Sequence, residues 1–322
     1  MKKRILVYEY LSGGGLMTAG DAASGELLAS GTSMRDATVA DLLACGVYAV
    51  TVATCAEASA VPAPATAAAL QRAGESASDF VARLADTHDA VWVVAPETEG
   101  LLAQLQRCVD PARWLGCDAA SIALASSKRA TLAHLAEAGI PTPLAFAHAP
   151  ETRRWVVKPD DGAGAIDKRV HASADAARHD AARRAHDGNP ATIEPFVEGE
   201  ALSISLLCSA ARTELLSVNR QRVSIDADGA LVYLGVDVNV LPPSSPRSVV
   251  LAALAEQVGR AMPGLRGFVG IDLVWHAQRG PVLIEVNPRV TCAYVGLSQA
   301  LGRNLAADVI AAHTLVGAHV DA

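Results

Sequence analysis

Two apolar runs late in the chain show the alternation expected of a buried β-hairpin. Gly270–His276 and Gly280–Asn287 are rich in β-branched and other apolar residues, and a short polar break separates them. Asp272 is the only charged residue of the first run, while Glu285 and Asn287 lie two positions apart in the second. Period-2 alternation places Glu285 and Asn287 on one face of their strand, and pairing of the two strands could bring Asp272 to them.

The other apolar patterns predict two kinds of sheet. In the first third, strands are expected at Ile5–Tyr8, Val47–Ala53 and Ala90–Ala95, and helices at Thr32–Cys45 and Ser76–Asp86. Strands that alternate with helices form a small parallel sheet covered on both faces. Later helices are expected at Lys128–Ala138, Ser173–His186 and Pro246–Ala261, and strands at Arg153–Pro159, Ala191–Glu194, Leu202–Cys208, Glu214–Val218 and Leu231–Val236. The last three strands are expected to be antiparallel, so the predicted fold class combines α/β and α+β.

Composition and charge narrow the class of protein. The chain has 322 residues, a length that suggests two or three domains. Of these residues 51% are hydrophobic and 19% charged, which is enough apolar material for a full core. Because the net charge is −7 and no basic run occurs, we do not expect the protein to bind nucleic acid. Because no run of about 18 uncharged apolar residues occurs, we expect no membrane span.

The cysteines and the first residues indicate a cytoplasmic protein. The six cysteines include no C-x-x-C pair, which favours reduced thiols over a disulfide framework or a zinc site. The start resembles a signal peptide only superficially, because Glu9 ends the apolar run after four residues.

The polar side chains of the predicted hairpin are hard oxygen donors. Mg²⁺ is usually bound by one or two carboxylates, and substrate phosphates fill its remaining positions. Arg289 follows directly and offers a planar fork that matches a phosphate. Asp272, Glu285 and Asn287 are therefore candidate magnesium ligands beside a nucleotide. The alternative is a plain hairpin whose charged residues lie on its solvent-exposed face.

A second candidate phosphate site lies near the middle of the chain. Lys158 is expected at the end of a strand, just before the small-residue loop Asp160–Ala165. The backbone amides of such a loop, which includes Gly162 and Gly164, and a compact ammonium group both suit phosphates. A simple hairpin turn is the alternative.

Three further segments could contact a ligand. The backbone of Ala191–Glu200 could bind an adenine edge, with Glu200 near the ribose, but an ordinary domain connection with solvated acids is equally open. Glu97 and Glu99 follow a predicted strand and could hold a substrate amine, or serve as first-turn acids of a helix. The loop Glu9–Gly15 could approach a ligand, but it lacks G-x-G-x-x-G, so no dinucleotide site is expected.

In this order, the motifs resemble those of the ATP-grasp ligases over about residues 115–300. The shared features are a lysine that opens a helix (Lys128), Val-Val-Lys-Pro around Lys158, a Gly-rich loop, Glu-Pro-Phe-Val-x-Gly-Glu from Glu194, and Asp272 followed by Glu-x-Asn-Pro-Arg. The opening Val-Tyr-Glu-Tyr-Leu-Ser-Gly-Gly-Gly and the later Asn-Arg-Gln are similar to a narrower group. That group comprises the tyramine–L-glutamate ligases of methanofuran synthesis and their relatives in methylotrophic bacteria.

The resemblance implies an ATP-grasp fold with three parts: an N-terminal α/β domain (1–118), a lid lobe with its leading helix (119–198) and a C-terminal lobe with a metal site (199–322). It also implies the following site residues. Phosphates would be bound by Lys128, Lys158, Gly162 and Gly164; adenine and ribose by Glu194, Phe196, Val197 and Glu200; Mg²⁺ or Mn²⁺ by Asp272, Glu285 and Asn287. Lys158 and Arg289 would act on the transferred phosphoryl group. Two acids in the loop, Asp160 and Asp161, depart from the family pattern.

The implied reaction is ATP-dependent amide formation through an acylphosphate, which needs positioning and positive charge but no protein nucleophile. The partners would be a small-molecule acid and amine: glutamate with tyramine, tyrosine or a growing glutamyl chain in the narrower group. A homodimer is left open. Two alternatives are a carboxylase-type member that uses bicarbonate and a nucleotide-binding sensor without turnover.

Overall fold

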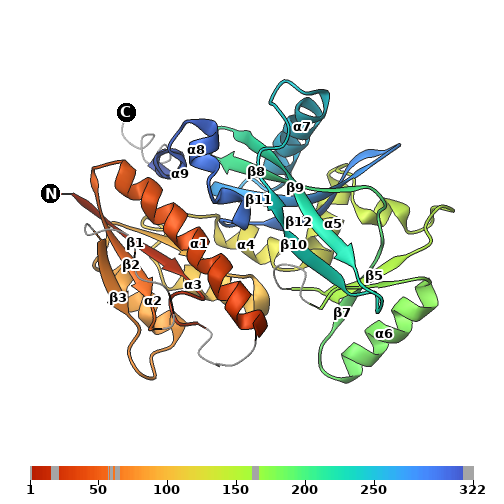
Figure 1. Ribbon diagram of the computed structural model, residues 1–322, viewed down its shortest axis with the longest axis horizontal. Helices are drawn as coiled ribbons and strands as arrows, with labels where there is room; N and C mark the ends of the chain where they lie inside the picture. The colour runs from red at the N-terminus through yellow and green to blue at the C-terminus, as the bar shows by residue number, and fades with distance from the viewer. Residues whose placement is uncertain are drawn as a thin grey trace.

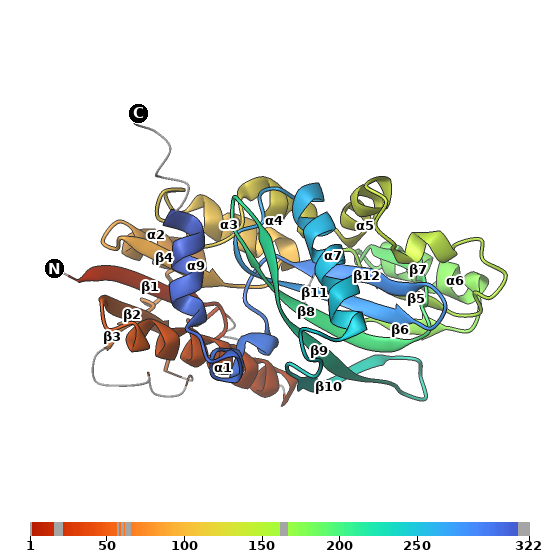
Figure 2. The same ribbon diagram turned by 90° about the horizontal axis from the view of Figure 1, so that it is seen from above.

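The computed structural model describes residues 2–15, 22–56, 58, 61, 66–161 and 167–314. Three β-sheets follow one another along the chain, with helices packed around them (Figure 1). We call them the N-terminal sheet, the lid sheet and the C-terminal sheet. Figures 1 and 2 both place the N-terminal sheet at one end of the molecule and the lid sheet at the other, with the C-terminal sheet between them.

The N-terminal sheet is parallel, as predicted, and its strand order is β3-β2-β1-β4. Its elements are β1 (Lys3–Glu9), α1 (Ala22–Ala44), β2 (Tyr48–Thr54), β3 (Thr66–Leu70), α2 (Ala77–Ala85), β4 (Ala90–Val94), η1 (Thr98–Gly100) and α3 (Leu101–Arg107). Adjacent residues of β1 point to opposite faces: Val7 is buried in the cluster that includes α1, and Tyr8 in the one that includes α2. Helices therefore cover both faces.

Two local features of this region differ from the prediction. Helix α1 begins about ten residues earlier than expected. The sequence did not reveal this start, because the first ten residues include glycines and serines, which have low helix propensity. At Gly31 an added Cβ would lie 2.6 Å from the Glu9 carboxylate oxygens, so a larger residue does not fit. The strand β3 was not predicted, since an alanine-rich segment lacks the β-branched residues typical of strands.

The remaining elements form two antiparallel sheets. The lid sheet has the order β6-β5-β7, and the C-terminal sheet has the order β10-β9-β8-β11-β12. Between the first two sheets lie α4 (Ala119–Ala125), α5 (Lys128–Glu137) and η2 (Pro143–Phe146). The lid elements are β5 (Trp155–Pro159), β6 (Arg169–His171), α6 (Ala174–His186) and β7 (Ala191–Pro195). The C-terminal elements are β8 (Glu200–Cys208), β9 (Thr213–Ile225), β10 (Leu231–Asp237), α7 (Pro246–Ala261), β11 (Gly267–His276), β12 (Gly280–Asn287), η3 (Cys292–Tyr294), α8 (Leu297–Leu301) and α9 (Leu305–Thr314).

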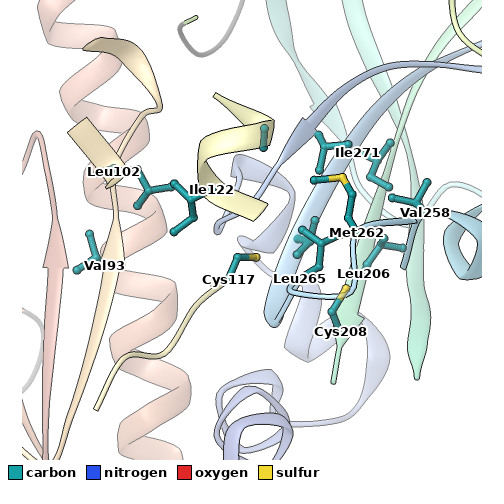
Figure 3. Close-up of a cluster of buried hydrophobic side chains, with 14 of the residues drawn as sticks. Val93, Leu102, Cys117, Ile122, Leu206, Cys208, Val258, Met262, Leu265 and Ile271 are labelled. Atoms are coloured by element: carbon teal, nitrogen blue, oxygen red, sulfur yellow. The ribbon is translucent and has the colours of Figure 1, made fainter. Parts of the chain in front are cut away.

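One hydrophobic core joins the N-terminal sheet to the C-terminal sheet (Figure 3). It runs from Val93 of β4 and Leu102 of α3, through Ile122 of α4, to Val258 of α7 and Ile271 of β11. Burying one such side chain contributes about 1.5–3 kcal/mol. The shared core therefore holds these two sheets in a fixed relation and leaves the lid sheet outside it.

The C-terminal helices also bind the N-terminal region. The Asp41 carboxylate of α1 accepts hydrogen bonds from the Tyr294 hydroxyl (2.7 Å) and the Ser298 hydroxyl (2.5 Å).

None of the described helices combines the length and the apolar character needed to cross a membrane. The predicted fold class, a parallel N-terminal sheet with α+β lobes, is confirmed, while the domain boundaries at 118 and 198 stay predictions.

A hairpin of the C-terminal sheet reaches the lid sheet. The turn between β9 and β10 forms an antiparallel bridge with β6, in which Arg169 pairs with Ala230. Val170 donates its N–H to the Gly229 carbonyl oxygen at 2.7 Å, and Leu231 donates its N–H to the Lys168 carbonyl oxygen at 2.9 Å. The hairpin thereby ties the lid to the C-terminal sheet.

We expect Gly229→Ala to weaken this contact more than Gly188→Ala does. Both glycines have φ near +80° (81° and 82°), so alanine brings a similar backbone strain to each. An added Cβ at Gly229 would lie 2.5 Å from the Val170 carbonyl oxygen, whereas at Gly188 it would meet nothing within 4 Å. Hydrogen exchange of the Val170 and Leu231 amides should be about tenfold faster in Gly229→Ala than in the unchanged chain. Gly188→Ala should leave the exchange of these two amides as it is. Equal exchange in the two variants would contradict the contact.

Candidate active site

The predicted hairpin forms, and it brings its polar side chains together. Strands β11 and β12 pair antiparallel, with Asp272 opposite Glu285 and Gly270 opposite Asn287. The Asn287 side-chain amide lies 3.4 Å from the Asp272 carboxylate, to which it donates. Three oxygen-bearing side chains therefore share one face of the C-terminal sheet, as the alternation predicts.

Two lysines reach Glu285 from other elements. The Nζ atom of Lys128, the first residue of α5, lies 3.2 Å from Glu285 Oε1, and that of Lys168, just before β6, lies 3.2 Å from Oε2. Burial alone would raise the pKa of Glu285, but the positive charges of these lysines and of Lys158 lower it to about 2. Glu285 therefore stays ionised, at a point where the α5 terminus, the lid sheet and the C-terminal sheet meet.

Asp272 lies in a different electrostatic environment. Its carboxylate accepts a hydrogen bond from the Gln221 side chain of β9 at 2.8 Å. Burial, and then the charge of Glu285, raise the pKa of Asp272 to about 6. Asp272 is half-buried and Glu285 is buried, so the two neighbouring carboxylates repel each other, and a cation between them would remove that repulsion.

The donor set fits a divalent cation that also binds phosphates. Within the described ranges, no group of three or more His, Cys, Asp and Glu side chains could hold a metal ion. A cation here would depend on two carboxylates, the Asn287 amide oxygen and phosphate oxygens, a set that suits Mg²⁺. The assignment of Asp272, Glu285 and Asn287 as ligands stays a prediction.

The lid sheet holds a buried ion pair. Lys158 Nζ lies 2.8 Å from Glu194 Oε2, and the side chains are 3% and 4% exposed. The other carboxylate oxygen of Glu194 is buried and has no hydrogen-bond partner in the described part of the chain. A buried acceptor without a donor costs about 1–3 kcal/mol. A nucleotide amino or hydroxyl group would satisfy it, so the lid residues fit a nucleotide.

The segment after β7 has packing partners of its own. Phe196 donates its N–H to the Arg154 carbonyl oxygen at 2.9 Å. The Arg154 guanidinium lies over the Phe196 ring, 4.2 Å from the ring centre. Val197 is buried against Phe146 and Val282. The adenine contacts predicted for Phe196 and Val197 stay predictions.

Glu200, the first residue of β8, has two arginine partners. Its carboxylate lies 2.8 Å from Arg220 Nε and 2.5 Å from Arg247 Nη1. It lies opposite Trp275, three positions beyond Asp272 along β11, so alternation directs it to the other face of the sheet. There it lines a cavity of about 590 Å³ with Arg247 and Trp275. Its predicted role at the ribose stays a prediction.

Arg289 is bound by a residue from the N-terminal region. Its Nε–H donates to Glu97 Oε1 at 3.0 Å, and its Nη2–H donates to Glu97 Oε2 at 3.1 Å. Both side chains are buried, 9% and 4% exposed. The sequence left Glu97 and Glu99 as ligands for an amine or as first-turn acids. Glu99 does lie in the first turn of η1, whereas Glu97 precedes that turn, caps no helix with its side chain and pairs with Arg289.

The two loop acids that depart from the family pattern have protein partners. The Asp160 carboxylate accepts hydrogen bonds from the Ser127 hydroxyl at 2.6 Å and the Arg129 N–H at 2.9 Å, at the start of α5. The Asp161 carboxylate accepts one from the Glu99 N–H at 2.8 Å. These acids fix the start of the loop to α5 and to the N-terminal region.

Sequence reasoning missed Lys168 and Gln221. Lys168 could have been found from hairpin register, because β5 pairs Val157 with Arg169 and one more step places Lys158 opposite Lys168. Two lysines that face each other across a hairpin are unfavourable unless anions lie near them. Gln221 belongs to a polar cluster that the sequence shows, but its contact depends on the register of β9. The predicted loop glycines, Gly162 and Gly164, lie outside the described residues.

Two domain families and a named enzyme match this chain. Residues 125–293 match the ATP-grasp domain family, and residues 48–122 match the pre ATP-grasp 3 domain family. The tyramine–L-glutamate ligase of Methanocaldococcus fervens is 29% identical over 211 residues, which are 65% of this chain. The match spans 61% of that relative's length, less than two thirds.

Solved structures share the architecture. An ATP-grasp superfamily protein from Archaeoglobus fulgidus superposes with a TM-score of 0.65 at 21% identity, covering 96% of this chain and 88% of that one. An L-amino acid ligase from Bacillus licheniformis superposes with a TM-score of 0.68 at 15% identity, covering 97% and 74%. At such low identities these likenesses show the fold alone.

Proposed function

Because the chain belongs to the ATP-grasp family, we propose that it is an ATP-dependent ligase that joins a carboxylate to an amine. The ATP-grasp match covers more than half of the chain, and the predicted family and fold are thereby confirmed. The observation that carries the proposal is the cluster around Glu285, where hard oxygen donors and lysines gather between the lid sheet and the C-terminal sheet. Such a cluster suits phosphoryl groups.

In the first step, a carboxylate oxygen of the acid attacks the γ-phosphorus of ATP. The bond from that phosphorus to the ADP oxygen breaks, which leaves an acylphosphate and ADP. Lys128, Lys158 and Lys168 would hold the phosphates and neutralise the charge that develops on them. A divalent cation held by the two hairpin carboxylates and Asn287 would supply further positive charge at the same oxygens.

In the second step, the nitrogen of the amine attacks the acyl carbon. The bond from that carbon to the phosphate oxygen breaks, inorganic phosphate leaves, and the nitrogen loses one proton to give the amide. The chain's contribution is to hold both reactants close and to exclude water from the acylphosphate.

We infer more specific substrates from the relative and from the opening motif. The acid would be glutamate, through its side-chain carboxylate, and the amine would be tyramine, tyrosine or a glutamyl chain. This would place the enzyme in the synthesis of a methanofuran-type cofactor in the cytoplasm. The identity to the Methanocaldococcus fervens ligase supports this choice.

The proposal is tested by a screen of ATP consumption. Phosphate release would be measured with Mg²⁺ or Mn²⁺ against acids and amines, with glutamate, tyrosine and tyramine first. We expect release only when an acid and an amine are both present. Release stimulated by bicarbonate alone would favour a carboxylase-type enzyme, and tight ATP binding without release would favour a sensor.

A further inference from the structure

The loop between β4 and α3 contacts residues that follow β12 of the C-terminal sheet and β5 of the lid sheet. Glu97 binds Arg289, just after β12 of the C-terminal sheet, and the Glu99 N–H binds Asp161, just after β5 of the lid sheet. Glu99 has a φ of 53°, which makes the sharp turn between these two contacts. The loop is held from within, since Gly100 donates its N–H to the Glu97 carbonyl oxygen at 3.0 Å.

Three of the five N–H groups of the Arg289 guanidinium donate hydrogen bonds within the described residues. Two of its five N–H groups donate to Glu97, and Nη1 donates to the Val290 carbonyl oxygen at 3.2 Å. In the part of the chain that the structure describes, one N–H on Nη1 and one on Nη2 remain. A guanidinium held along one edge can offer two such groups to the oxygens of a phosphoryl group.

The surroundings explain why this arginine needs a partner. Arg289 is two residues from Asn287 and lies within electrostatic reach of Glu285. The side chains of Arg289 and Glu97 are only 9% and 4% exposed, so the Glu97 carboxylate supplies the counter-charge that a buried guanidinium needs. Without Glu97, the main remaining attraction for the cation would come from Glu285.

We propose that Glu97 is a positioning residue for phosphoryl transfer: it holds Arg289 so that the two remaining N–H groups face the transferred phosphoryl group. The inference rests on the proposed function, because it presumes a phosphoryl group at this place. Since Asp161 binds the same loop through the Glu99 N–H, the N-terminal region, the lid and the C-terminal sheet all meet at this loop.

The kinetic test is a double-mutant cycle. Glu97→Gln cannot accept both guanidinium donors, so we expect kcat to fall about 10²-fold while KM for ATP changes less than about threefold. Glu97→Asp keeps the carboxylate and should recover part of kcat. In an Arg289→Lys background, Glu97→Gln should cost less than about threefold more. Independent, additive losses would overturn the proposal.

A binding measurement needs neither substrate. The probe is ADP with Mg²⁺ and aluminium fluoride, which imitates a phosphoryl group in transfer. Glu97→Gln should bind this mixture at least about tenfold more weakly than the unchanged chain, with the affinity for ADP and Mg²⁺ alone kept within about threefold. A merely structural role would lower the melting temperature and leave the ratio of the two affinities unchanged.

The outcomes separate the two levels of inference. If the unchanged chain does not bind ADP and Mg²⁺, the proposed function fails and this inference fails with it. If the mimic binds the unchanged chain and Glu97→Gln equally well, only the positioning role is overturned. Glu151→Gln is the matched control, because it removes an exposed carboxylate that lies 2.6 Å from Arg279, away from the cluster.

Discussion

Replacing Glu285 with Gln is expected to lower ATP-dependent phosphate release by at least about 10²-fold. The substitution keeps the side-chain shape but removes the charge that Lys128 and Lys168 share. It also removes one of the two carboxylates available to a divalent cation, so the Mg²⁺ concentration for half-maximal activity should rise. Both quantities follow from steady-state phosphate release at saturating ATP and varied Mg²⁺.

A surface glutamate provides the matched control for this prediction. Glu214 also lies between two cations, 3.0 Å from Arg212 and 2.6 Å from Arg303, but far along the chain from the hairpin. Glu214→Gln should leave phosphate release and its Mg²⁺ dependence unchanged. Turnover like that of the unchanged chain in Glu285→Gln would end the metal assignment.

Replacing Lys158 with Met is expected to have two separable effects. It leaves Glu194 buried without its cation, and breaking a buried pair in this way typically costs about 3–5 kcal/mol of unfolding free energy. It also removes a cation predicted to bind phosphate, so ATP affinity should fall by more than about tenfold. Denaturant unfolding measures the first effect, and calorimetric titration with ATP measures the second.

The double variant Lys158→Met/Glu194→Gln distinguishes stability from function. Because glutamine carries no charge, the double variant should regain most of the lost stability while ATP affinity stays low. Recovery of both properties would show that Lys158 acts only as a counterion. Glu198→Gln gives the scale for an exposed pair: its carboxylate lies 2.7 Å from Arg154, and its loss should cost less than about 1 kcal/mol.

Local patterns in the sequence determined most of the elements and the centre of the site. Helix α7 runs from Pro246 to Ala261 as predicted, because proline suits the first helical position and the Ser245 side chain caps the helix. The hairpin followed from period-2 alternation and a turn, so Asp272, Glu285 and Asn287 could be placed on one face. Each of these signals acts between residues that are close in the chain or paired across one short turn.

Only the tertiary structure decided what surrounds that centre. Glu97 and Arg289 are 192 residues apart, and Lys168 and Glu285 are 117 apart, so no periodic pattern connects them. Glu200 was placed on its face of the sheet by the pairing of β8 with β11, which its own segment does not encode. Ion pairs of this kind depend on how whole sheets pack, because burial removes the water that would otherwise separate the charges.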